Sequence, residues 1–337
     1  MKLLRTLLFP FSILYGAITS LRNYFYDIGW FKSTHYDFPV ICVGNLSTGG
    51  TGKSPMVQLL VEFLRKDFRV GILSRGYKRK TSGYREVLVE STALEVGDEP
   101  LQFKQNFPET TVAVCADRRE GISKLKPKVD IILLDDAFQH RKVKASTYIL
   151  LTPFDDLYID DYMLPSGNLR ESRKGAKRAD MIVVTKCPEG VAYSELQNIQ
   201  HKLNLRSDQR VYFSKIGYDK MIYGVSETLH LSYLRDKKFT LVTGIANPKP
   251  LVNFLDRNHF SFEHLKFGDH HDFSNSEIEK LKKKEIILTT EKDFMRLQPK
   301  LGKYALYYLP IKTHILNEQE GFFEERILEE IDKARFQ

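Results

Sequence analysis

Short apolar runs recur along the chain from residue 40 onward and alternate with segments of helical periodicity. Six of these runs have the length of strands, at 40–44, 70–74, 112–116, 130–134, 148–151 and 181–185. Strands that alternate with helices predict a parallel sheet in an α/β fold. The runs are almost continuously apolar, which is expected when helices cover both faces of a sheet. The pattern therefore predicts a doubly wound parallel sheet.

The regular alternation breaks off in the middle of the chain and resumes later. We expect the larger domain over 33–205, a linker over 206–238 and a smaller C-terminal α/β domain over 239–337. Ser274 followed by Glu277 forms a capping-box sequence and predicts a helix start in the second domain. A length of 337 residues exceeds the usual size of one core, so two domains are expected.

The N-terminal segment, residues 1–32, combines apolar residues with flanking positive charge. Sixteen uncharged residues lie between Arg5 and Arg22, fewer than the roughly 20 that a membrane-spanning helix needs. Apolar residues recur at helical spacing, at Leu7, Phe11, Leu14, Ile18 and Leu21. This pattern predicts an amphipathic helix that lies in a membrane interface. A helix packed in the core and a secretory signal peptide are the two alternatives.

Composition narrows the class of protein. A hydrophobic fraction of 42% and a charged fraction of 28% are typical of a globular fold and argue against a disordered chain or a multi-span membrane protein. Three cysteines stand far apart in apolar runs, as expected of reduced thiols in a cytoplasm. The net charge of +8 suits an anionic partner, whether nucleic acid, phospholipid or phosphorylated metabolite. Because no recognition helix or base-stacking platform stands out, we expect no nucleic-acid partner.

The strongest motif joins the first apolar run to a helix through a glycine-rich turn. This order of strand, turn and helix predicts a phosphate-binding loop, because glycines let successive backbone amides converge on phosphates at a helix N-terminus. Lys53 would reach the β- and γ-phosphates and act in catalysis, and Ser54 would ligate Mg²⁺. A purely structural glycine turn is the alternative. The expected ATP-binding residues are Ser47, Thr48, Gly49, Gly50, Thr51, Gly52, Lys53 and Ser54, with Ser47 where the general motif has its first glycine.

A pair of acids, Asp135 and Asp136, follows the apolar run 130–134. At the end of a strand beside a phosphate loop, such acids are expected to hold Mg²⁺, either directly or through water. A solvated turn is the alternative for an acidic strand end alone. Thr185-Lys186 lacks the aspartate with which GTPases read guanine, so ATP is the expected nucleotide. Together these features predict a P-loop NTPase-like doubly wound sheet with an N-terminal amphipathic helix and a smaller C-terminal α/β domain.

A series of further motifs runs from the apolar N-terminal helix to residue 293. The motifs are Gly44-Asn-Leu46, Gly49-Gly-Thr-Gly-Lys-Ser-Pro55, Leu73-Ser-Arg-Gly-Tyr77, Gly97-Asp-Glu-Pro100, Ala116-Asp-Arg-Arg119, Leu134-Asp-Asp-Ala-Phe-Gln-His140, Leu164-Pro-Ser-Gly-Asn-Leu-Arg-Glu171, Asp269-His-His271 and Thr290-Glu-Lys-Asp293. This series resembles the tetraacyldisaccharide 4′-kinase family. Two departures are small: Ala137 stands where the family usually has glycine, and Ser172 where it usually has proline.

The resemblance implies a kinase of lipid A biosynthesis. Such an enzyme transfers the γ-phosphate of ATP, with Mg²⁺, to the 4′-hydroxyl of a tetraacylated glucosamine disaccharide 1-phosphate and gives lipid IVA. It implies a lipid-linked substrate, a membrane surface at the cytoplasmic face of the bacterial inner membrane, and no obligate protein partner. Two alternatives stay open: another P-loop small-molecule kinase or ligase, and a membrane-associated regulatory ATPase.

The resemblance also implies roles for single residues. Asp98 is similar to the family's catalytic base, although Asp98-Glu99-Pro100 also reads as a helix start capped by Asp98. His270 corresponds to a histidine that pairs with this base, with His271 as an adjacent alternative. Glu171 is similar to an additional metal-site carboxylate. Substrate binding is expected at Arg75, Arg119, Gln139, His140 and Arg170, since the planar guanidinium suits phosphate.

Overall fold

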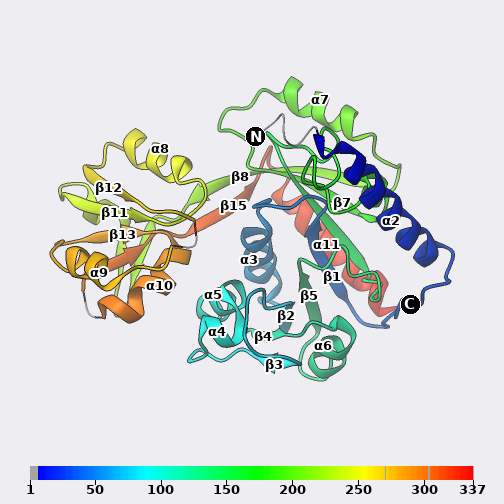
Figure 1. The fold of residues 1–337 in the computed structure, drawn as a ribbon, viewed down its shortest axis with the longest axis horizontal. Coiled ribbons are helices and arrows are strands. Elements are labelled where there is room, and N and C mark those ends of the chain that lie inside the picture. Colours follow the sequence, from blue (N-terminus) through cyan, green and yellow to red (C-terminus); the bar gives the residue numbers. More distant parts are fainter. Residues whose placement is uncertain (1–6, 270, 303, 337) are drawn as a thin grey trace. The chain divides into compact units, whose positions relative to one another are not determined.

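The computed structural model describes residues 7–269, 271–302 and 304–336 and divides the chain into two compact units. Unit 1 comprises Met1–Ile216 and Thr313–Gln337, and unit 2 comprises Gly217–Lys312 (Figure 1). Unit 2 is therefore an insertion into unit 1, and the chain passes between the two units twice, after Ile216 and after Lys312. Each unit contains its own sheet and its own core.

Unit 1 is built on a sheet of nine strands in the order β15-β8-β7-β6-β1-β5-β2-β4-β3. β1 lies between β5 and β6 and pairs in parallel with both, and the short β3 is antiparallel to β4. The carboxyl ends of the parallel strands therefore share one edge. The strands are β1 Val40–Asn45, β2 Val70–Ser74, β3 Arg85–Glu86, β4 Thr111–Val114, β5 Ile131–Asp135, β6 Thr147–Pro153, β7 Met181–Thr185, β8 Arg210–Tyr218 and β15 Ile311–Ile315.

Helices cover both faces of this sheet, as the continuous apolar runs predict. One core joins Ile41 and Val43 of β1 to helices α3 (Lys53–Leu64), α5 (Asp98–Asn106) and α11 (Glu320–Arg335). The other core joins Val40 and Cys42 of the same strand to the opposite layer. That layer contains α6 (Arg118–Leu125), the 3₁₀ helix η1 (Arg173–Arg178) and α7 (Tyr193–Leu203), while the short α4 spans Ala93–Val96. Alternate residues of β1 thus pack into two different cores, one on each face of the sheet.

Unit 2 contains a six-stranded sheet in the order β10-β9-β14-β13-β11-β12. Its strands β12, β11, β13 and β14 pair in parallel, and β9 and β10 extend the sheet in antiparallel fashion. The strands are β9 Met221–Gly224, β10 Thr228–His230, β11 Phe239–Thr243, β12 Phe262–Lys266, β13 Ile287–Thr289 and β14 Leu306–Tyr308. The helices are η2 Leu231–Leu234, α8 Lys249–Arg257, α9 Asn275–Leu281 and α10 Glu291–Leu301. The predicted capping box is present, since the Ser274 and Glu277 side chains bond reciprocally at the start of α9.

The domain boundaries of the structure differ from the predicted boundaries in two places. Residues 206–238 are not a linker, because they contain β8, β9, β10 and η2. The last 25 residues do not belong to the C-terminal unit; they return to unit 1 as part of β15 and α11. Phe323, Ile327 and Ile331 of α11 are buried against the sheet of unit 1. This return depends on packing partners distant in sequence, which local periodicity does not reveal.

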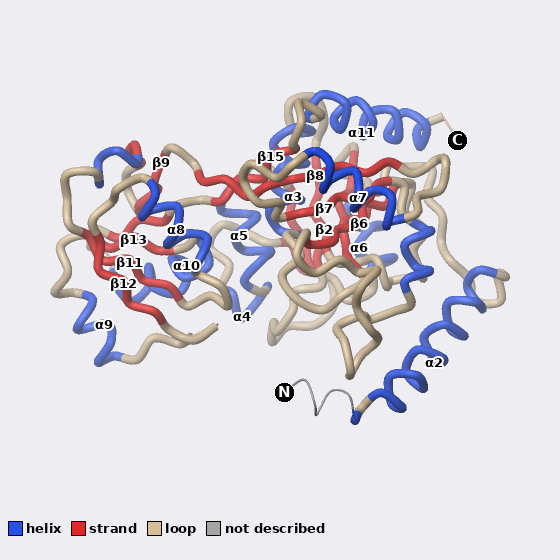
Figure 2. The backbone as a smooth tube through the Cα atoms, turned by 90° about the horizontal axis from the view of Figure 1, so that it is seen from above, coloured by secondary structure: helices blue, strands red, loops and turns tan. Residues whose placement is uncertain are grey.

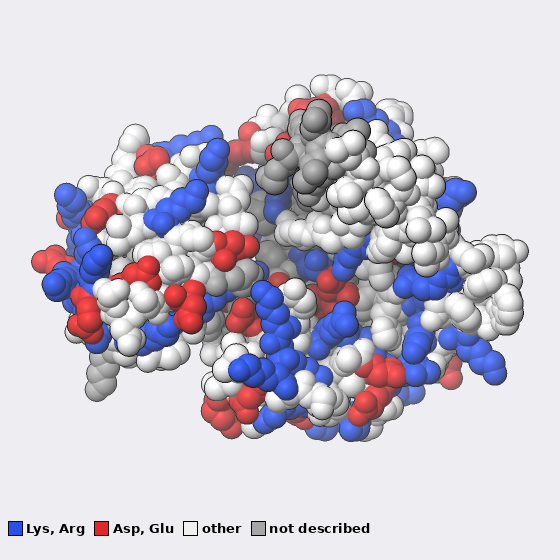
Figure 3. Space-filling view, viewed as in Figure 1, with Lys and Arg blue, Asp and Glu red and all other residues white. Residues whose placement is uncertain are grey.

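The N-terminal helix α2 (Phe9–Asp27) packs with its polar side inward. Its buried residues are Ser12, Thr19 and Asn23, whereas Phe11 and Ile18 are 62% and 60% exposed. Figure 2 shows α2 at the periphery of unit 1, beside loops rather than on the sheet, and uncharged residues dominate the surface over it in Figure 3. A helix packed in the core by its apolar side is therefore excluded. Among the described residues, no helix is long and apolar enough to cross a membrane.

Candidate functional site

The glycine-rich turn connects the end of β1 to the start of α3 at the carboxyl edge of the sheet. β1 ends at Asn45 and α3 begins at Lys53. Gly49 and Gly52 have φ angles of 113° and 90°, in the left-handed region where a side chain is strained. The glycines are therefore required by the backbone path of the loop, and this agrees with the predicted phosphate loop.

Side chains at the ends of β1 and β7 hold the loop in place. Asn45 Nδ2 donates a hydrogen bond of 2.9 Å to Thr51 Oγ1, and Thr185 Oγ1 donates one of 2.7 Å to the Thr51 carbonyl. Lys186 Nζ donates to the Gly50 carbonyl. The sequence singles out Thr185 and Lys186 only as an incomplete guanine-reading motif, whereas in the structure both side chains support the phosphate loop. The sequence signal that could have identified this role is their position at the carboxyl end of β7. The phosphate loop follows the carboxyl end of β1, and both strands belong to the same sheet.

Three charged residues meet beside the loop. Lys53 Nζ lies 3.7 Å from Asp136 Oδ1, and Arg170 Nη2 donates to the same oxygen at 2.8 Å. Arg170 Nη1 donates to Asp136 Oδ2 at 3.2 Å, so the guanidinium grips both carboxylate oxygens. Burial alone would raise the pKa of Asp136, but the hydrogen bond from Arg170 and the charge of Lys53 lower it overall. The predicted residues Lys53, Asp136 and Arg170 thus form one cluster.

Asp135 is the more buried of the two strand-end acids. It is 1% exposed, and its Oδ2 accepts a 2.9 Å hydrogen bond from Ser74 Oγ. Its Oδ1 has no hydrogen-bond partner among the described residues. Burial first, and then the negative charges of Glu99 and Asp136, raise the pKa of Asp135 to about 7. Such a carboxylate favours a proton or a cation as its partner.

Glu99 is a residue of this site that the sequence reasoning passed over. Ser54 Oγ donates a hydrogen bond of 2.9 Å to Glu99 Oε1, which ties the start of α5 to the phosphate loop. Asp98 is the first residue of α5, and Gly97 takes the capping position before it. Asp98 is therefore not the helix cap, which was the alternative to a catalytic role. Asp98 is half-buried. Because the adjacent residue Glu99 is hydrogen-bonded to Ser54, Asp98 lies near the phosphate loop at the carboxyl edge of the sheet.

The residues around Ser54 fit a Mg²⁺ ion that is also held by nucleotide phosphates. Ser54 Oγ, Glu99 and the unpartnered buried oxygen of Asp135 supply the hard oxygen ligands that Mg²⁺ prefers. Nowhere in 7–269, 271–302 and 304–336 do three or more His, Cys, Asp or Glu side chains form a metal cage. Mg²⁺ usually takes one or two carboxylates and completes its shell with water and phosphate oxygens. Asp135 is the better of the two strand-end candidates, since Asp136 is already paired with Arg170.

Glu171 does not have the geometry of the expected metal ligand. It is completely buried, and Arg178 Nη2 donates to both of its oxygens at 2.9 Å. Asn23 Nδ2 donates to Oε2 at 2.8 Å and Gln139 Nε2 donates to Oε1 at 2.9 Å. A carboxylate offers about four acceptor sites, and these four contacts use them. Glu171 is thus a buried junction that joins α2, Gln139 and η1.

The expected substrate-binding residues lie in different surroundings. Arg75 lines a pocket of about 370 Å³ together with Lys78 and Arg79, at the carboxyl end of β2. Arg119 is exposed and pairs with Asp117 at 2.7 Å, so it is not in the cluster around Lys53. Arg75 therefore lies in a basic pocket, whereas Arg119 forms an ion pair with its near neighbour Asp117.

Gln139 and His140, two further expected substrate residues, lie in the turn after β5. Gln139 Nε2 bonds both the Asn45 carbonyl, at 2.7 Å, and Glu171, so this side chain braces the end of β1. Burial and the nearby charge of Arg118 lower the pKa of His140 to about 4, which makes His140 neutral at pH 7. The side-chain amide of Gln139 is therefore engaged in hydrogen bonds within the protein, and the imidazole of His140 is uncharged.

The expected histidine His270 lies outside the described residues. Its neighbour His271 does have a described environment: its Nε2 lies 3.0 Å from Glu277 Oε2, and its ring packs against Phe267 and Phe273. Glu277 is also the capping-box residue of α9, and the contact with His271, followed by the bonds from Ser274, lowers its pKa to about 2. His271 is thus engaged within unit 2.

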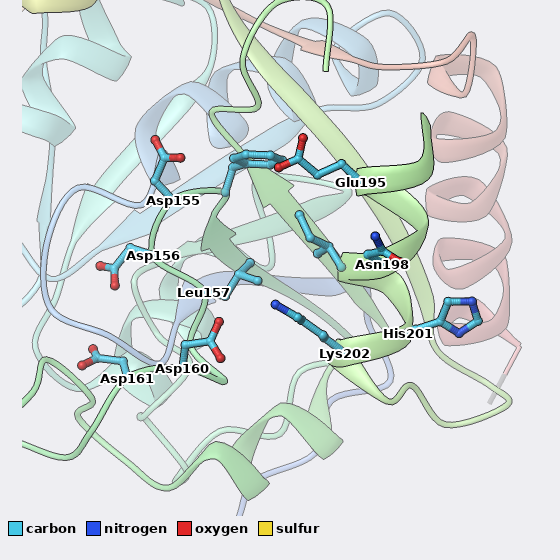
Figure 4. A pocket seen from close by; sticks show the side chains of 11 residues that line it. Asp155, Asp156, Leu157, Asp160, Asp161, Glu195, Asn198, His201 and Lys202 are labelled. Carbon is cyan, nitrogen blue, oxygen red and sulfur yellow. The ribbon is translucent and has the colours of Figure 1, made fainter. Parts of the chain in front are cut away.

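A larger pocket of about 690 Å³ lies between residues 154–161 and α7. Figure 4 shows Glu195 and Lys202 projecting from α7 toward the segment that carries the aspartates. Four aspartates and Glu195 line it, and the pocket contains none of the predicted site residues. Its acidic lining disfavours phosphate groups, so the phosphate chemistry belongs to the edge of the sheet at Lys53.

A strand, a glycine loop with a lysine at the start of a helix, and acids at the end of the adjacent strand define a P-loop phosphotransferase. A family model described as LpxK: Tetraacyldisaccharide-1-P 4′-kinase matches residues 4–332. The chain belongs to this tetraacyldisaccharide 4′-kinase family, as its sequence motifs predict.

Individual relatives agree over nearly the full length. A tetraacyldisaccharide 4′-kinase of Flavobacterium johnsoniae is 49% identical, with 96% of each chain covered. One of Flavobacterium psychrophilum is 46% identical over 99% of each chain. A crystal structure of an apo form of LpxK from Aquifex aeolicus, in complex with ATP, has a TM-score of 0.80 and 31% identity, covering 97% of this chain and 99% of that chain. The predicted P-loop fold class is confirmed.

Proposed function

We propose that this chain transfers the γ-phosphate of ATP to the 4′-hydroxyl of a tetraacylated glucosamine disaccharide 1-phosphate and thereby forms lipid IVA. Family membership supports the reaction. The observation that carries the assignment of the site is the hydrogen bond between Ser54 and Glu99, because it brings the start of α5, and with it Asp98, to the phosphate loop. A sugar hydroxyl is a weak nucleophile and needs a base at this place.

The residues of the site divide the work of phosphoryl transfer. Lys53 and Arg170 supply positive charge where negative charge spreads over the transferring group. Bound Mg²⁺, held by Ser54 and Asp135, would neutralise further charge on the phosphates. Asp98 accepts the proton of the attacking hydroxyl. The basic pocket at Arg75 is suited to a second phosphate, such as the 1-phosphate of the acceptor.

We place the reaction at a membrane surface, on the cytoplasmic side where ATP is available. The support is α2, whose outward side presents Leu14, Ile18 and Leu21 at 60%, 60% and 54% exposure. A water-exposed apolar helix face is costly unless another surface covers it, and a bilayer interface is such a surface. The acyl chains of the substrate lie in the same phase, so the docked enzyme would meet its acceptor there.

A thin-layer assay with labelled ATP and purified disaccharide 1-phosphate tests the proposal. The wild-type protein should label the lipid, and Asp98→Ala should lower kcat by about 10²–10⁴ with the KM for ATP little changed. Glu109→Ala, an exposed carboxylate just beyond α5, is the matched control and should keep full activity. Phosphate release without a labelled lipid would instead favour a regulatory ATPase, and full activity of Asp98→Ala would remove Asp98 from its role.

A further inference from the structure

The polar side of α2 is bonded to one short segment of unit 1, residues 166–171, which we call the connecting segment. Ser12 Oγ donates to Ser166 Oγ at 2.8 Å and accepts from the Ser166 amide at 3.0 Å. Tyr15 Oη donates to the Arg170 carbonyl at 3.0 Å. Asn23 Nδ2 donates to Glu171 Oε2 at 2.8 Å. Contacts from nearly the whole length of the helix thus converge on six residues.

The other side of the connecting segment is bonded to the phosphate loop. The Asn168 carbonyl accepts a 2.7 Å hydrogen bond from the amide of Thr48, a loop residue, and the Arg170 amide donates to Leu46 at 2.7 Å. The Arg170 side chain reaches Asp136, which lies 3.7 Å from Lys53. The same few residues therefore contact α2 through one set of atoms and the nucleotide site through another.

The inward side chains of α2 form a stripe only when the segment is helical. Positions 12, 15, 19 and 23 share one helix face because they are three or four residues apart. None of the buried core clusters contains a residue of α2, so apolar core packing contributes little to the helical form. Most of the stability of a helix in a protein comes from packing of its apolar face rather than from helix propensity, and the apolar face of α2 has no such packing among the described residues of unit 1. Burial of the outward apolar side in a bilayer would favour the helical form and so lower the entropy cost of docking the stripe.

We propose that the connecting segment couples membrane binding of α2 to nucleotide binding at the phosphate loop, with Tyr15 and Asn23 as positioning residues. This inference rests on the membrane docking proposed above. A membrane that orders α2 favours the state in which Tyr15 and Asn23 hold residues 170 and 171, and this state keeps Arg170 at Asp136. Such coupling is reciprocal, so Mg²⁺–nucleotide must strengthen membrane binding by the factor by which the membrane strengthens nucleotide binding.

The test measures the Kd of a non-hydrolysable ATP analogue with Mg²⁺, with and without vesicles of phosphatidylethanolamine and phosphatidylglycerol. For the wild-type protein we expect vesicles to lower this Kd by about fivefold or more, the lower range of usual coupling. Flotation of the same samples should show a matching gain in vesicle affinity on adding the analogue. Asn23→Ala and Tyr15→Phe should still float with vesicles but lose most of the vesicle effect on the Kd.

Tyr24→Phe is the matched control for Tyr15→Phe, because it removes the same hydroxyl from the outward side, where Tyr24 is 56% exposed. It should retain the full vesicle effect. If wild-type protein floats but its Kd is unchanged by vesicles, the coupling is refuted while the membrane proposal stands. If it does not float, the membrane proposal itself fails. If Asn23→Ala does not fold, Tyr15→Phe decides, and a full vesicle effect in that variant removes Tyr15 from the coupling.

Discussion

Charged substitutions on the outward side of α2 should release the protein from membranes without unfolding it. Leu14 and Ile18 are each 60% exposed, so about three fifths of each side chain is available to the bilayer. Full burial of such a side chain contributes about 1.5–3 kcal/mol, and the available part therefore contributes about 1–2 kcal/mol. Leu14→Asp with Ile18→Asp removes about 2–4 kcal/mol, and at 1.4 kcal/mol per tenfold the membrane affinity falls roughly 30- to 700-fold.

Flotation with vesicles that contain phosphatidylglycerol measures this loss, and thermal unfolding measures the fold. The free energy of unfolding should change by no more than about 0.5 kcal/mol, as for exposed positions generally. The control removes two apolar side chains of similar exposure elsewhere in unit 1, Tyr193→Asp with Phe322→Asp, at 66% and 67% exposure. Undiminished flotation of the α2 variant, or an equal loss in the control, would refute the membrane role of this face. A large drop in stability would show that α2 packs by its apolar side.

Three further predictions concern the phosphate-loop site. Lys53→Ala should lower turnover by about a hundredfold or more, because the loss of one transition-state contact costs about 2.7–4 kcal/mol. The Tm should not change, and near-normal turnover would contradict the assignment of the phosphate loop. The pKa of Asp135 is raised from 3.8 to about 7 in the folded state. The contribution of its proton to the free energy of unfolding is therefore fully present below pH 3.8 and is lost as pH rises from there through about 7. Mg²⁺ should therefore raise Tm more at about pH 8 than at about pH 6, and Asp135→Asn should abolish that difference. Glu171→Ala should destabilise the fold by about 3–5 kcal/mol, because Arg178 loses its buried partner; an unchanged Tm with weakened Mg²⁺ binding would restore Glu171 as a metal ligand.

Local signals were sufficient where one element carries the whole feature. The apolar run 40–44, the glycines after it and Lys53 form a continuous stretch, so the phosphate loop and its position at a strand end were predictable from spacing alone. The same holds for Asp135, the last residue of a buried strand, and for Asp136, which follows it; predicting their place needed only the rule that parallel strands end at one edge of a sheet. The amphipathic N-terminal helix was equally visible in its periodicity.

Tertiary structure decided the features that depend on contacts between distant segments. Glu171 has an acidic side chain in a family motif, yet whether it binds metal or Arg178 depends on η1 and α2, which lie on either side of it in sequence. Glu99 could not be identified because its partner, Ser54, is 45 residues away and a single glutamate carries no spacing signal. The return of residues 313–337 to unit 1 and the inward polar stripe of α2 have the same origin. Periodicity shows that a helix has two unlike faces, but only the groups that pack against it determine which face turns inward.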